Sequence, residues 1–229
     1  MNKLAIVGYG KMGRMIEQLA PQYDFEIHAR IDVGGEFASV QGADVAIEFT
    51  QPDAVAENVE KLVALRIPVI VGTTGWSAQM DRVRAAIAKN DAQMIWAPNF
   101  SVGVTVFSKL VSEAARLLAA EPDYAAWAWE IHHSAKKDAQ SGTLLKLVDD
   151  MKRAGYTRTI DASSNRAGAH PGTHEVGFDS GADTITLRHT ARNRDGFARG
   201  ALKAARWIVD HPDQRGLLEF SDILFRGQL

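Results

Sequence analysis

The stretch that decides the fold, residues 3–20, reads KLAIVGYGKMGRMIEQLA. Its first part, KLAIV, is short and apolar like a buried strand, and residues 11–20 carry apolar side chains at helical spacing. Between them, Gly8, Gly10 and Gly13 have the spacing G-x-G-x-x-G. Because these glycines follow a predicted strand directly and open a predicted helix, they have the context that a dinucleotide-binding turn requires.

Each glycine has a distinct expected role in such a turn. Gly8 permits the tight turn, Gly10 lets the backbone approach a pyrophosphate, and Gly13 allows close packing of helix on sheet. The phosphates would then lie at the helix N-terminus. Asp32 follows the second predicted strand, where an acid can bind ribose hydroxyls. The alternative is a purely structural glycine turn with a surface acid.

Strand-like and helix-like segments alternate over the first hundred residues. The predicted strands are 3–7, 25–31, 44–49, 67–72 and 92–97, and the predicted helices are 11–20, 52–65 and 77–90. This alternation predicts a parallel, doubly wound α/β sheet of the Rossmann type. The connection DVGGEFASVQGA between the second and third strands is too short and glycine-rich for a full helix, so an abbreviated crossover is expected.

The pattern changes after Pro98. A long amphipathic helix is predicted over 103–120, followed by strands at 124–133, 157–164, 173–180 and 183–193 with one helix at 142–155. Several strands with one helix indicate a smaller, largely antiparallel α+β domain. A last helix is predicted over 195–211, with a short tail after it. We therefore predict a dinucleotide-binding domain at 1–101, to which 195–229 returns, and a substrate-binding and oligomerisation domain at 102–194.

Composition excludes several classes of protein. The net charge of −2 gives no reason to expect nucleic acid or an anionic membrane as a partner. Cysteine is absent, so the chain has no disulfide, no thiolate zinc site and no cysteine nucleophile. No stretch approaches the roughly 20 apolar residues that span a bilayer. A cytoplasmic protein is expected.

Two short motifs follow the fourth and fifth predicted strands, GTTG at 72–75 and APNF at 97–100. Both lie at carboxyl ends of parallel strands, the edge where open α/β sheets bind ligands. Thr73, Thr74 and Asn99 could contact the nicotinamide half of a dinucleotide. Ordinary turn chemistry explains either motif equally well, and the same holds for EFTQP at 48–52.

The densest chemistry lies in EIHHSAKKDAQSGT, residues 130–143. Strand alternation places Glu130 and His132 on one face and His133 on the other. Because the two histidines point apart and cysteine is missing, no metal site is predicted. We interpret Trp127 and Trp129 as sheet packing or a subunit contact.

Ser-Gly-Thr at 141–143 opens a predicted helix, as an ordinary N-cap or as a site for a carboxylate. Lys136 and Lys137, taken alone, read as a solvated charge pair. A histidine, a lysine and a helix N-terminus in one short loop together favour a carboxylate-bearing substrate with acid catalysis beside it.

GYGKMG, EFTQP, GTTG, APNFSVGV and EIHHSAKKDAQSGT occur in the order and approximate spacing of bacterial dihydrodipicolinate reductase, also called 4-hydroxy-tetrahydrodipicolinate reductase. The chain resembles this family over essentially its whole length. The resemblance implies NAD(P)H-dependent reduction of 4-hydroxy-tetrahydrodipicolinate to tetrahydrodipicolinate, with loss of water, in the diaminopimelate route to lysine. It also implies a homotetramer assembled through the sheet of the second domain.

Carried over by position, the resemblance implies that His132 is the proton donor and acceptor and Lys136 the second proton donor. The substrate contacts it implies are His133, Lys136, Ser141, Gly142 and Thr143, with Arg194 as a further one. The cofactor contacts it implies are Gly8, Tyr9, Gly10, Lys11, Met12, Gly13, Asp32, Gly72, Thr73, Thr74, Ala97, Pro98, Asn99 and Phe100.

The chain departs from the family pattern beside this site. Family members often read HHRHK, whereas Ser134 and Ala135 stand between His133 and Lys136 here, and Gln140 replaces a usual proline. The segments after the second strand and after the helix at 142–155 are also abbreviated. None of these changes removes His132, Lys136 or the Ser-Gly-Thr helix start.

The cofactor is expected to be NADH or NADPH, with NADH used at least as well. Asp32 would accept hydrogen bonds from both adenine-ribose hydroxyls and would repel a 2′-phosphate. Lys11 and Arg14 are the counter-evidence, since either could reach such a phosphate. Two other functions fit parts of the pattern: another two-domain NAD(P)-dependent dehydrogenase for a small amino-acid-like carboxylate, or a non-catalytic dinucleotide-binding protein.

Overall fold

A computed structural model of the chain describes residues 1–32 and 34–226. The chain divides into two compact units, Met1–Val102 with the segment from Asp195 onward, and Gly103–Arg194. Each unit has its own sheet, and each is described separately below.

The first unit is built on a six-stranded sheet in the order β10-β5-β4-β3-β1-β2, and all of its strand pairs are parallel. This sheet confirms the predicted Rossmann-type fold. Its strands are β1 (Asn2–Val7), β2 (Phe25–Ile31), β3 (Val45–Glu48), β4 (Val69–Val71), β5 (Gln93–Trp96) and β10 (Gly216–Glu219). Its helices are α1 (Lys11–Leu19), α2 (Val55–Ala64), α3 (Met80–Lys89), α6 (Asp195–Asp210) and α7 (Phe220–Leu224).

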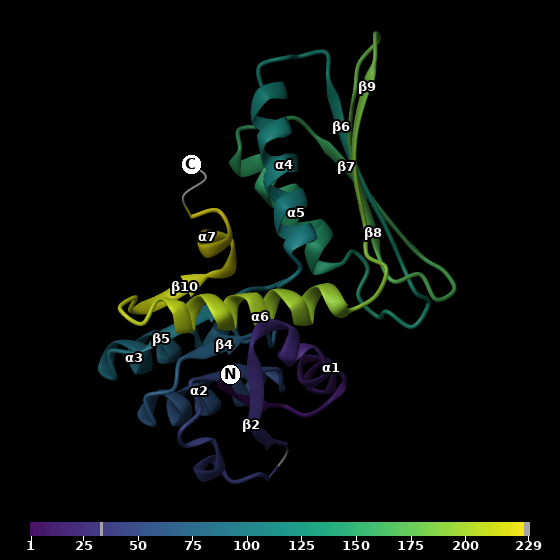
Figure 1. Cartoon of the computed structure of the whole chain (residues 1–229). Helices are drawn as coiled ribbons and strands as arrows, with labels where there is room; N and C mark the ends of the chain where they lie inside the picture. Colours follow the sequence, from purple (N-terminus) through teal and green to yellow (C-terminus); the bar gives the residue numbers. More distant parts are fainter. Residues whose placement is uncertain (33, 227–229) are drawn as a thin grey trace. The chain divides into compact units, whose positions relative to one another are not determined.

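Helices cover both faces of this sheet (Figure 1). Along β1, Leu4 and Ile6 pack into a cluster with α1 and α6, whereas Ala5 and Val7 pack into a second cluster with α2 and α3. A strand buried on both faces must be apolar at every position, which is why these strands read as continuous apolar runs. In the part of the β2–β3 crossover that the structure describes, which leaves out residue 33, the chain forms one 3₁₀ turn, Phe37–Val40, in place of a full helix.

The predicted short tail was wrong. After α6, the chain forms β10, which pairs in parallel with β5, and then α7. The sequence offers only Leu217 and Leu218 as an apolar run there. A strand this short is stabilised by pairing along the whole edge of β5. No local sequence pattern indicates that pairing.

The second unit consists of a four-stranded sheet covered on one face by two helices (Figure 1). The strands are β6 (Ala125–His132), β7 (Ile160–Arg166), β8 (Thr173–Asp179) and β9 (Thr184–Thr190), and the helices are α4 (Val102–Leu118) and α5 (Gly142–Arg153). In the order β7-β6-β8-β9, only the β6–β7 pair is parallel. The predicted α+β fold is therefore confirmed.

Strand β6 alternates between the two faces as predicted. Ala126, Ala128, Glu130 and His132 are buried, whereas Trp127, Trp129 and Ile131 are half-buried. The alanines pack beneath α4 and α5, with Phe107, Leu144 and Phe178 in the same cluster. The buried face of β6 therefore carries two polar side chains, Glu130 and His132, beyond the end of an apolar core. No helix of the described chain is both long and apolar enough to cross a membrane.

Candidate active site

In the glycine turn of the first unit, Gly8 and Gly13 lie directly against neighbouring backbone atoms. Gly8 has φ +95°, and a Cβ built there would lie 2.0 Å from the carbonyl oxygen of Phe49. A Cβ on Gly13 would lie 2.3 Å from the carbonyl oxygen of Gly8. Only glycine therefore fits at either position. These contacts give Gly8 the tight turn and Gly13 the close packing of helix on strand that the spacing predicts.

Gly10 differs from both, because a Cβ there would meet no described atom within 4 Å. Gly10 is the N-cap of α1, where no side chain caps the helix and no acidic residue lies in the first turn. The helix therefore presents free N–H groups and the positive end of its dipole at an open position. This arrangement fits a dinucleotide pyrophosphate.

The side chains of the loop between these glycines have other partners. Tyr9 and Met12 pack against the core, and the Tyr9 hydroxyl donates a hydrogen bond to Glu17. Lys11 is exposed. Tyr9 and Met12 are half-buried, so the exposed part of each side chain and its backbone are both open to a cofactor.

Asp32 follows β2 and is exposed. Two arginines lie near the turn: Arg14 is 5.7 Å and Arg30 is 5.9 Å from the centre of the Tyr9 ring. Sequence reasoning considered Arg14 and missed Arg30, which looks like an ordinary outward residue of a strand. The guanidinium of Arg30 is already paired with Glu17.

The turns after β3 and β4 are tied together by the buried carboxylate of Glu48. The Thr73 hydroxyl donates to this carboxylate at 2.7 Å and accepts the N–H of Thr50 at 2.7 Å. Thr50 and Asn58 also donate to Glu48. The Thr73 hydroxyl therefore donates its proton to Glu48 and has none left for a ligand. Thr74 is exposed, so its side chain is the one in this turn that faces solvent.

Phe100 is a core residue. Its ring is buried and packs against Phe220 with 5.0 Å between ring centres, and Ala97 is buried in the same cluster. The Asn99 side chain accepts the N–H of Ser101 at 2.8 Å, which is a turn contact, while Pro98 is exposed. Gly72 lies against the ring of Phe49, where a Cβ would be 2.1 Å away. Cofactor contacts of Ala97, Phe100 and Gly72 would therefore come from the backbone.

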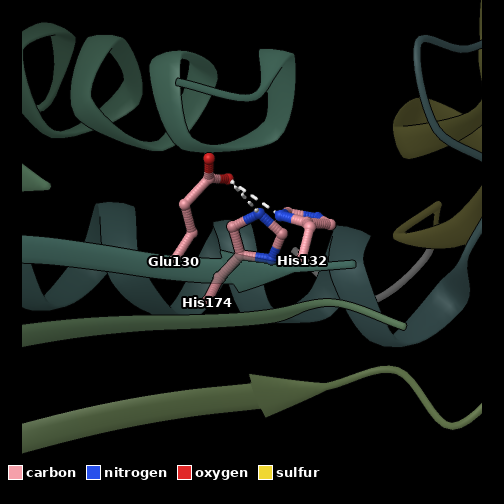
Figure 2. A group of neighbouring side chains, drawn as sticks. All are labelled: Glu130, His132 and His174. Atoms are coloured by element: carbon pink, nitrogen blue, oxygen red, sulfur yellow. Dashed lines mark ion pairs between the residues drawn. The ribbon is translucent and has the colours of Figure 1, made fainter. Parts of the chain in front are cut away.

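In the second unit, Glu130 is fully buried, and polar groups from β6, β7, β8 and the start of α5 surround its carboxylate. Figure 2 shows the two histidines of this group, His132 and His174. Its Oε1 accepts the N–H of Ser141 at 2.8 Å and the Arg166 guanidinium at 2.9 Å. Its Oε2 accepts the Ser141 hydroxyl and lies 3.3 Å from Nε2 of His174 and 3.4 Å from Nδ1 of His132. The 3.4 Å pair lacks hydrogen-bond geometry and is an ion pair only when His132 is protonated.

His132 keeps 11% of its side chain exposed, although its Nδ1 is fully buried. Burial lowers the pKa of His132, and the neighbouring Glu130 carboxylate opposes that shift. Burial and the nearby His132 lower the pKa of His174 to about 4. Burial also acts to raise the pKa of Glu130, but hydrogen bonds from Ser141 and Arg166 outweigh it and hold that pKa below its usual value.

The other predicted substrate residues differ in their exposure and in their partners. Ser141 caps α5, accepting the N–H of Leu144 at 3.2 Å, and both of its own donors go to Glu130. Gly142 is exposed and Thr143 half-buried, and their N–H groups belong to the unbonded first turn of the helix. Lys136 is half-buried and pairs with Asp138 at 2.8 Å. His133 is half-buried directly after the end of β6, and Arg194 is exposed beyond β9.

Glu130, His132 and His174 also offer three ligand atoms within 4.8 Å of one another. The predicted absence of a metal rested on His132 and His133 and did not consider this group. Carboxylate and imidazole are zinc ligands. However, the Arg166 guanidinium already lies 2.9 Å from the same carboxylate and supplies a positive charge there, although His132 Nδ1 and Arg166 Nε have no hydrogen-bond partner among the described residues.

Comparison with known proteins agrees with the motifs. Residues 2–100 match the family model described as dihydrodipicolinate reductase, N-terminus, and residues 103–224 match the model for its C-terminus. The chain belongs to the dihydrodipicolinate reductase family. The family resemblance inferred from the motifs is therefore confirmed.

Relatives and a solved structure match over nearly their whole length. The 4-hydroxy-tetrahydrodipicolinate reductase of Christiangramia forsetii is 34% identical, with 96% of this chain and 97% of the relative covered. That of Methanosarcina mazei is 33% identical, with 98% and 99% covered. The dipicolinate-bound dihydrodipicolinate reductase of Paenisporosarcina sp. TG-14 has a TM-score of 0.80 at 22% identity, covering 97% of this chain and 99% of that one. At that identity, the last comparison shows the fold.

Sequence reasoning missed the partners of Glu130. Arg166 and His174 lie in NRAGAHPGTHEVGF, residues 165–178, where the sequence predicts no site residue. A signal was present, since strand alternation puts Glu130 on the buried face, and a buried carboxylate needs partners. Which residues supply them depends on the pairing of β6 with β7 and β8, which the sequence alone does not show.

Proposed function

We propose that the chain reduces 4-hydroxy-tetrahydrodipicolinate to tetrahydrodipicolinate, with loss of water, using a reduced nicotinamide dinucleotide. Family membership over both halves of the chain supports this reaction. The observation that carries it is the junction of β6 and α5, where a histidine, a lysine and an open helix N-terminus come together on one unit. Loss of water from this cyclic imine dicarboxylate leaves a C=C bond conjugated with its C=N bond, and both binding the carboxylates and protonating this system after hydride transfer call for those three kinds of group.

The residues of the first unit would hold the cofactor through the glycine turn and Asp32. When bound, the reduced nicotinamide supplies a hydride to the substrate carbon. The open N-terminus of α1 at Gly10 binds the pyrophosphate, and Asp32 accepts hydrogen bonds from the adenine ribose. Backbone groups at 72–74 and 97–100 line the carboxyl edge of the sheet, where the nicotinamide half would lie.

The residues of the second unit would hold the substrate and move its proton. The N–H groups of Gly142 and Thr143, together with the Thr143 hydroxyl, bind a substrate carboxylate. Lys136 and His133 bring further donors to the same anion. His132, as the proton donor, quenches the negative charge that develops on the ring after hydride arrives, and Lys136 is the second donor. Acid catalysis of this kind is typically worth about 10²–10⁴ in rate.

We also propose that NADH serves at least as well as NADPH. Asp32 would meet a 2′-phosphate with like charge, and Arg30 is already paired with Glu17, which leaves Lys11 and Arg14 as the cations nearest the turn. Exclusive use of NADPH is therefore disfavoured. A homotetramer formed through the outer face of the second sheet is proposed on the family resemblance, and a cytoplasmic location stays a prediction.

Turnover of freshly prepared 4-hydroxy-tetrahydrodipicolinate tests the function directly. The purified chain should oxidise NADH in the presence of this compound and leave other small keto and imino acids unreduced. Comparing kcat/KM for NADH and NADPH at moderate salt tests the cofactor preference. No turnover with either cofactor would contradict the proposed function, and a hundredfold preference for NADPH would overturn the role given to Asp32.

A further inference from the structure

Glu130 joins two parts of the second unit that the proposed reaction needs together. One is His132, two residues further along β6 on the same buried face. The other is the start of α5, because Ser141 gives both its N–H and its hydroxyl to the Glu130 carboxylate. A fully buried carboxylate costs free energy unless it is well paired, so its position is restricted by all of its partners at once.

Building on the proposed function, we propose that Glu130 is a positioning residue, which holds the imidazole of His132 and the N-terminus of α5 in one arrangement so that proton donor and carboxylate site serve the same substrate. Figure 2 shows its side chain extending toward both His132 and His174.

The imidazole of His132 is confined from two sides. Glu130 lies 3.4 Å from Nδ1. On the other side, a Cβ built on Gly172 would lie 3.0 Å from both Nε2 and Cδ2. Since Nδ1 is buried against the carboxylate, Nε2 is the ring nitrogen that remains to exchange a proton with substrate. The carboxylate favours the tautomer and the charged state in which Nδ1 carries hydrogen.

The start of α5 is arranged by the same side chain. Because Glu130 accepts both donors of Ser141, the serine does not reach outward, and the N–H groups left at the helix start are those of Gly142 and Thr143. Loss of the carboxylate would free Ser141 and loosen this end. A substrate carboxylate bound there would then be held less firmly.

Charged and titratable groups face His132 from every element around it. Arg166 approaches from β7, His174 from β8, and Lys136 and Asp138 from the loop. His189 on β9 is the cross-strand neighbour of His174. Lys136 and Arg166 lower the pKa of His132, whereas Glu130 and Asp138 raise it. Removing Glu130 or Arg166 should therefore move the titration of His132 in opposite directions, which general damage to the fold would not do.

The test is a histidine NMR titration of the full-length protein, with the His132 signals assigned from His132→Asn. In Glu130→Gln, His132 should titrate at lower pH than in the wild type, and in Arg166→Gln at higher pH. Glu175→Gln is the matched control, since Glu175 is a half-buried β8 carboxylate paired with Arg188 on the opposite face, and it should leave His132 unchanged.

Kinetics and binding complete the test. Glu130→Gln should lower kcat by up to about 100-fold, because a misplacement of about 1 Å at the reacting groups can cost that much. It should also weaken the binding of pyridine-2,6-dicarboxylate. Its Kd for NADH, which depends on the first unit, should stay within twofold. Glu130→Asp should recover part of kcat. If Glu130→Gln does not fold, Glu130→Asp takes its place, and its His132 should titrate below that of the wild type because the shorter carboxylate lies further from Nδ1, while Glu175→Gln should show no shift.

Unchanged His132 titration in Glu130→Gln, or shifts of the same sign in Glu130→Gln and Arg166→Gln, would overturn the positioning role. The titration does not require turnover. A wild-type protein that fails to reduce the substrate would therefore defeat the proposed function, while the His132 shifts would still decide the role of Glu130.

Discussion

Glu48 and Glu130 are both fully buried carboxylates, yet their surroundings act in opposite directions. Around Glu48 the donors are neutral groups of Thr50, Thr73 and Asn58, and burial raises its pKa in spite of them. Around Glu130, the cationic Arg166 and two donors of Ser141 overcome burial. Glu130 therefore differs from Glu48 in accepting two donors from Ser141 and, in addition, a charged donor from Arg166, and a charged donor stabilises a buried carboxylate more than a neutral one.

Glu48 therefore makes folding less favourable as pH rises. Its pKa is higher in the folded protein than the unfolded value of 4.5, so the folded state holds the proton more tightly, and stability is lost as pH rises from that value through the folded-state pKa. Relative to the wild type, Glu48→Gln should gain stability between pH 5 and pH 8, as measured by urea unfolding. Glu57→Gln, an exposed residue with a pKa lowered by Lys61, is the control and should not gain. A constant difference between Glu48→Gln and the wild type over this range would contradict the prediction.

His132 and Lys136 should be needed for turnover and not for cofactor binding. Both lie in the second unit, whereas the glycine turn lies in the first. We expect His132→Ala and Lys136→Ala each to lower kcat about 10²- to 10⁴-fold, the range for proton donors, with the Kd for NADH nearly unchanged. Steady-state kinetics and fluorescence titration with NADH measure both quantities. Near-native turnover in either variant would remove that residue from its assigned role.

At the scale of elements, the turn between β1 and α1 contains one glycine with a structural role, Gly13, and one with an expected binding role, Gly10. Gly13→Ala places a methyl 2.3 Å from a backbone oxygen, so this variant should have a clearly lower Tm. Gly10→Ala meets nothing within 4 Å and should leave Tm almost unchanged. Because the space beside Gly10 is where the pyrophosphate is expected, Gly10→Ala should still weaken NADH binding about tenfold or more. Full NADH affinity in Gly10→Ala would argue against that placement.

The N-terminus of α5 leads to a corresponding prediction for binding of the substrate carboxylate. Pyridine-2,6-dicarboxylate, a flat analogue with both carboxylates, should compete with substrate, and Thr143→Val should weaken the competition. The reason is that the Thr143 hydroxyl and the N–H groups beside it converge on one anion. Thr184→Val, on the exposed edge strand β9, is a control that should leave inhibition unchanged. Absence of inhibition of the wild type at millimolar concentration would count against the carboxylate site.

At the scale of the whole molecule, the outer face of the second sheet is the feature without a covering layer among the described residues. Trp127, Trp129 and Ile131 lie half-buried on this face, opposite the face that α4 and α5 cover. Aromatic side chains at such a face are typical of subunit contacts.

We expect light scattering to give about four times the 25.0 kDa mass of the chain. Trp129→Lys should shift the mass toward smaller species, because it places a charge at the centre of the contact. Lys109→Glu, a charge change on α4 away from this sheet face, is the control. A wild-type monomer would contradict the proposed tetramer.

The sequence by itself determined the kind and order of the elements. Apolar runs and helical spacing are local properties, so the alternation over the first hundred residues, the change after Pro98 and the alternation along β6 could be predicted without knowing the fold. The glycine turn could be predicted for the same reason, since Gly8 and Gly13 are restricted by neighbours in the same βα unit or in the adjacent strand. The histidine, lysine and helix start at 130–143 are likewise one continuous stretch.

Only the tertiary structure decided which distant residues meet. Strand pairing brings Arg166 and His174 to Glu130 across β7 and β8, and Thr73 to Glu48 across β4. It also places Phe100 in the core, turns the predicted tail into β10 and α7, and commits both donors of Ser141 within the protein. These contacts depend on register and packing between segments far apart in the chain. Strand alternation in the sequence predicts that Glu130 is buried and therefore needs partners. Only the folded sheet shows which side chains they are.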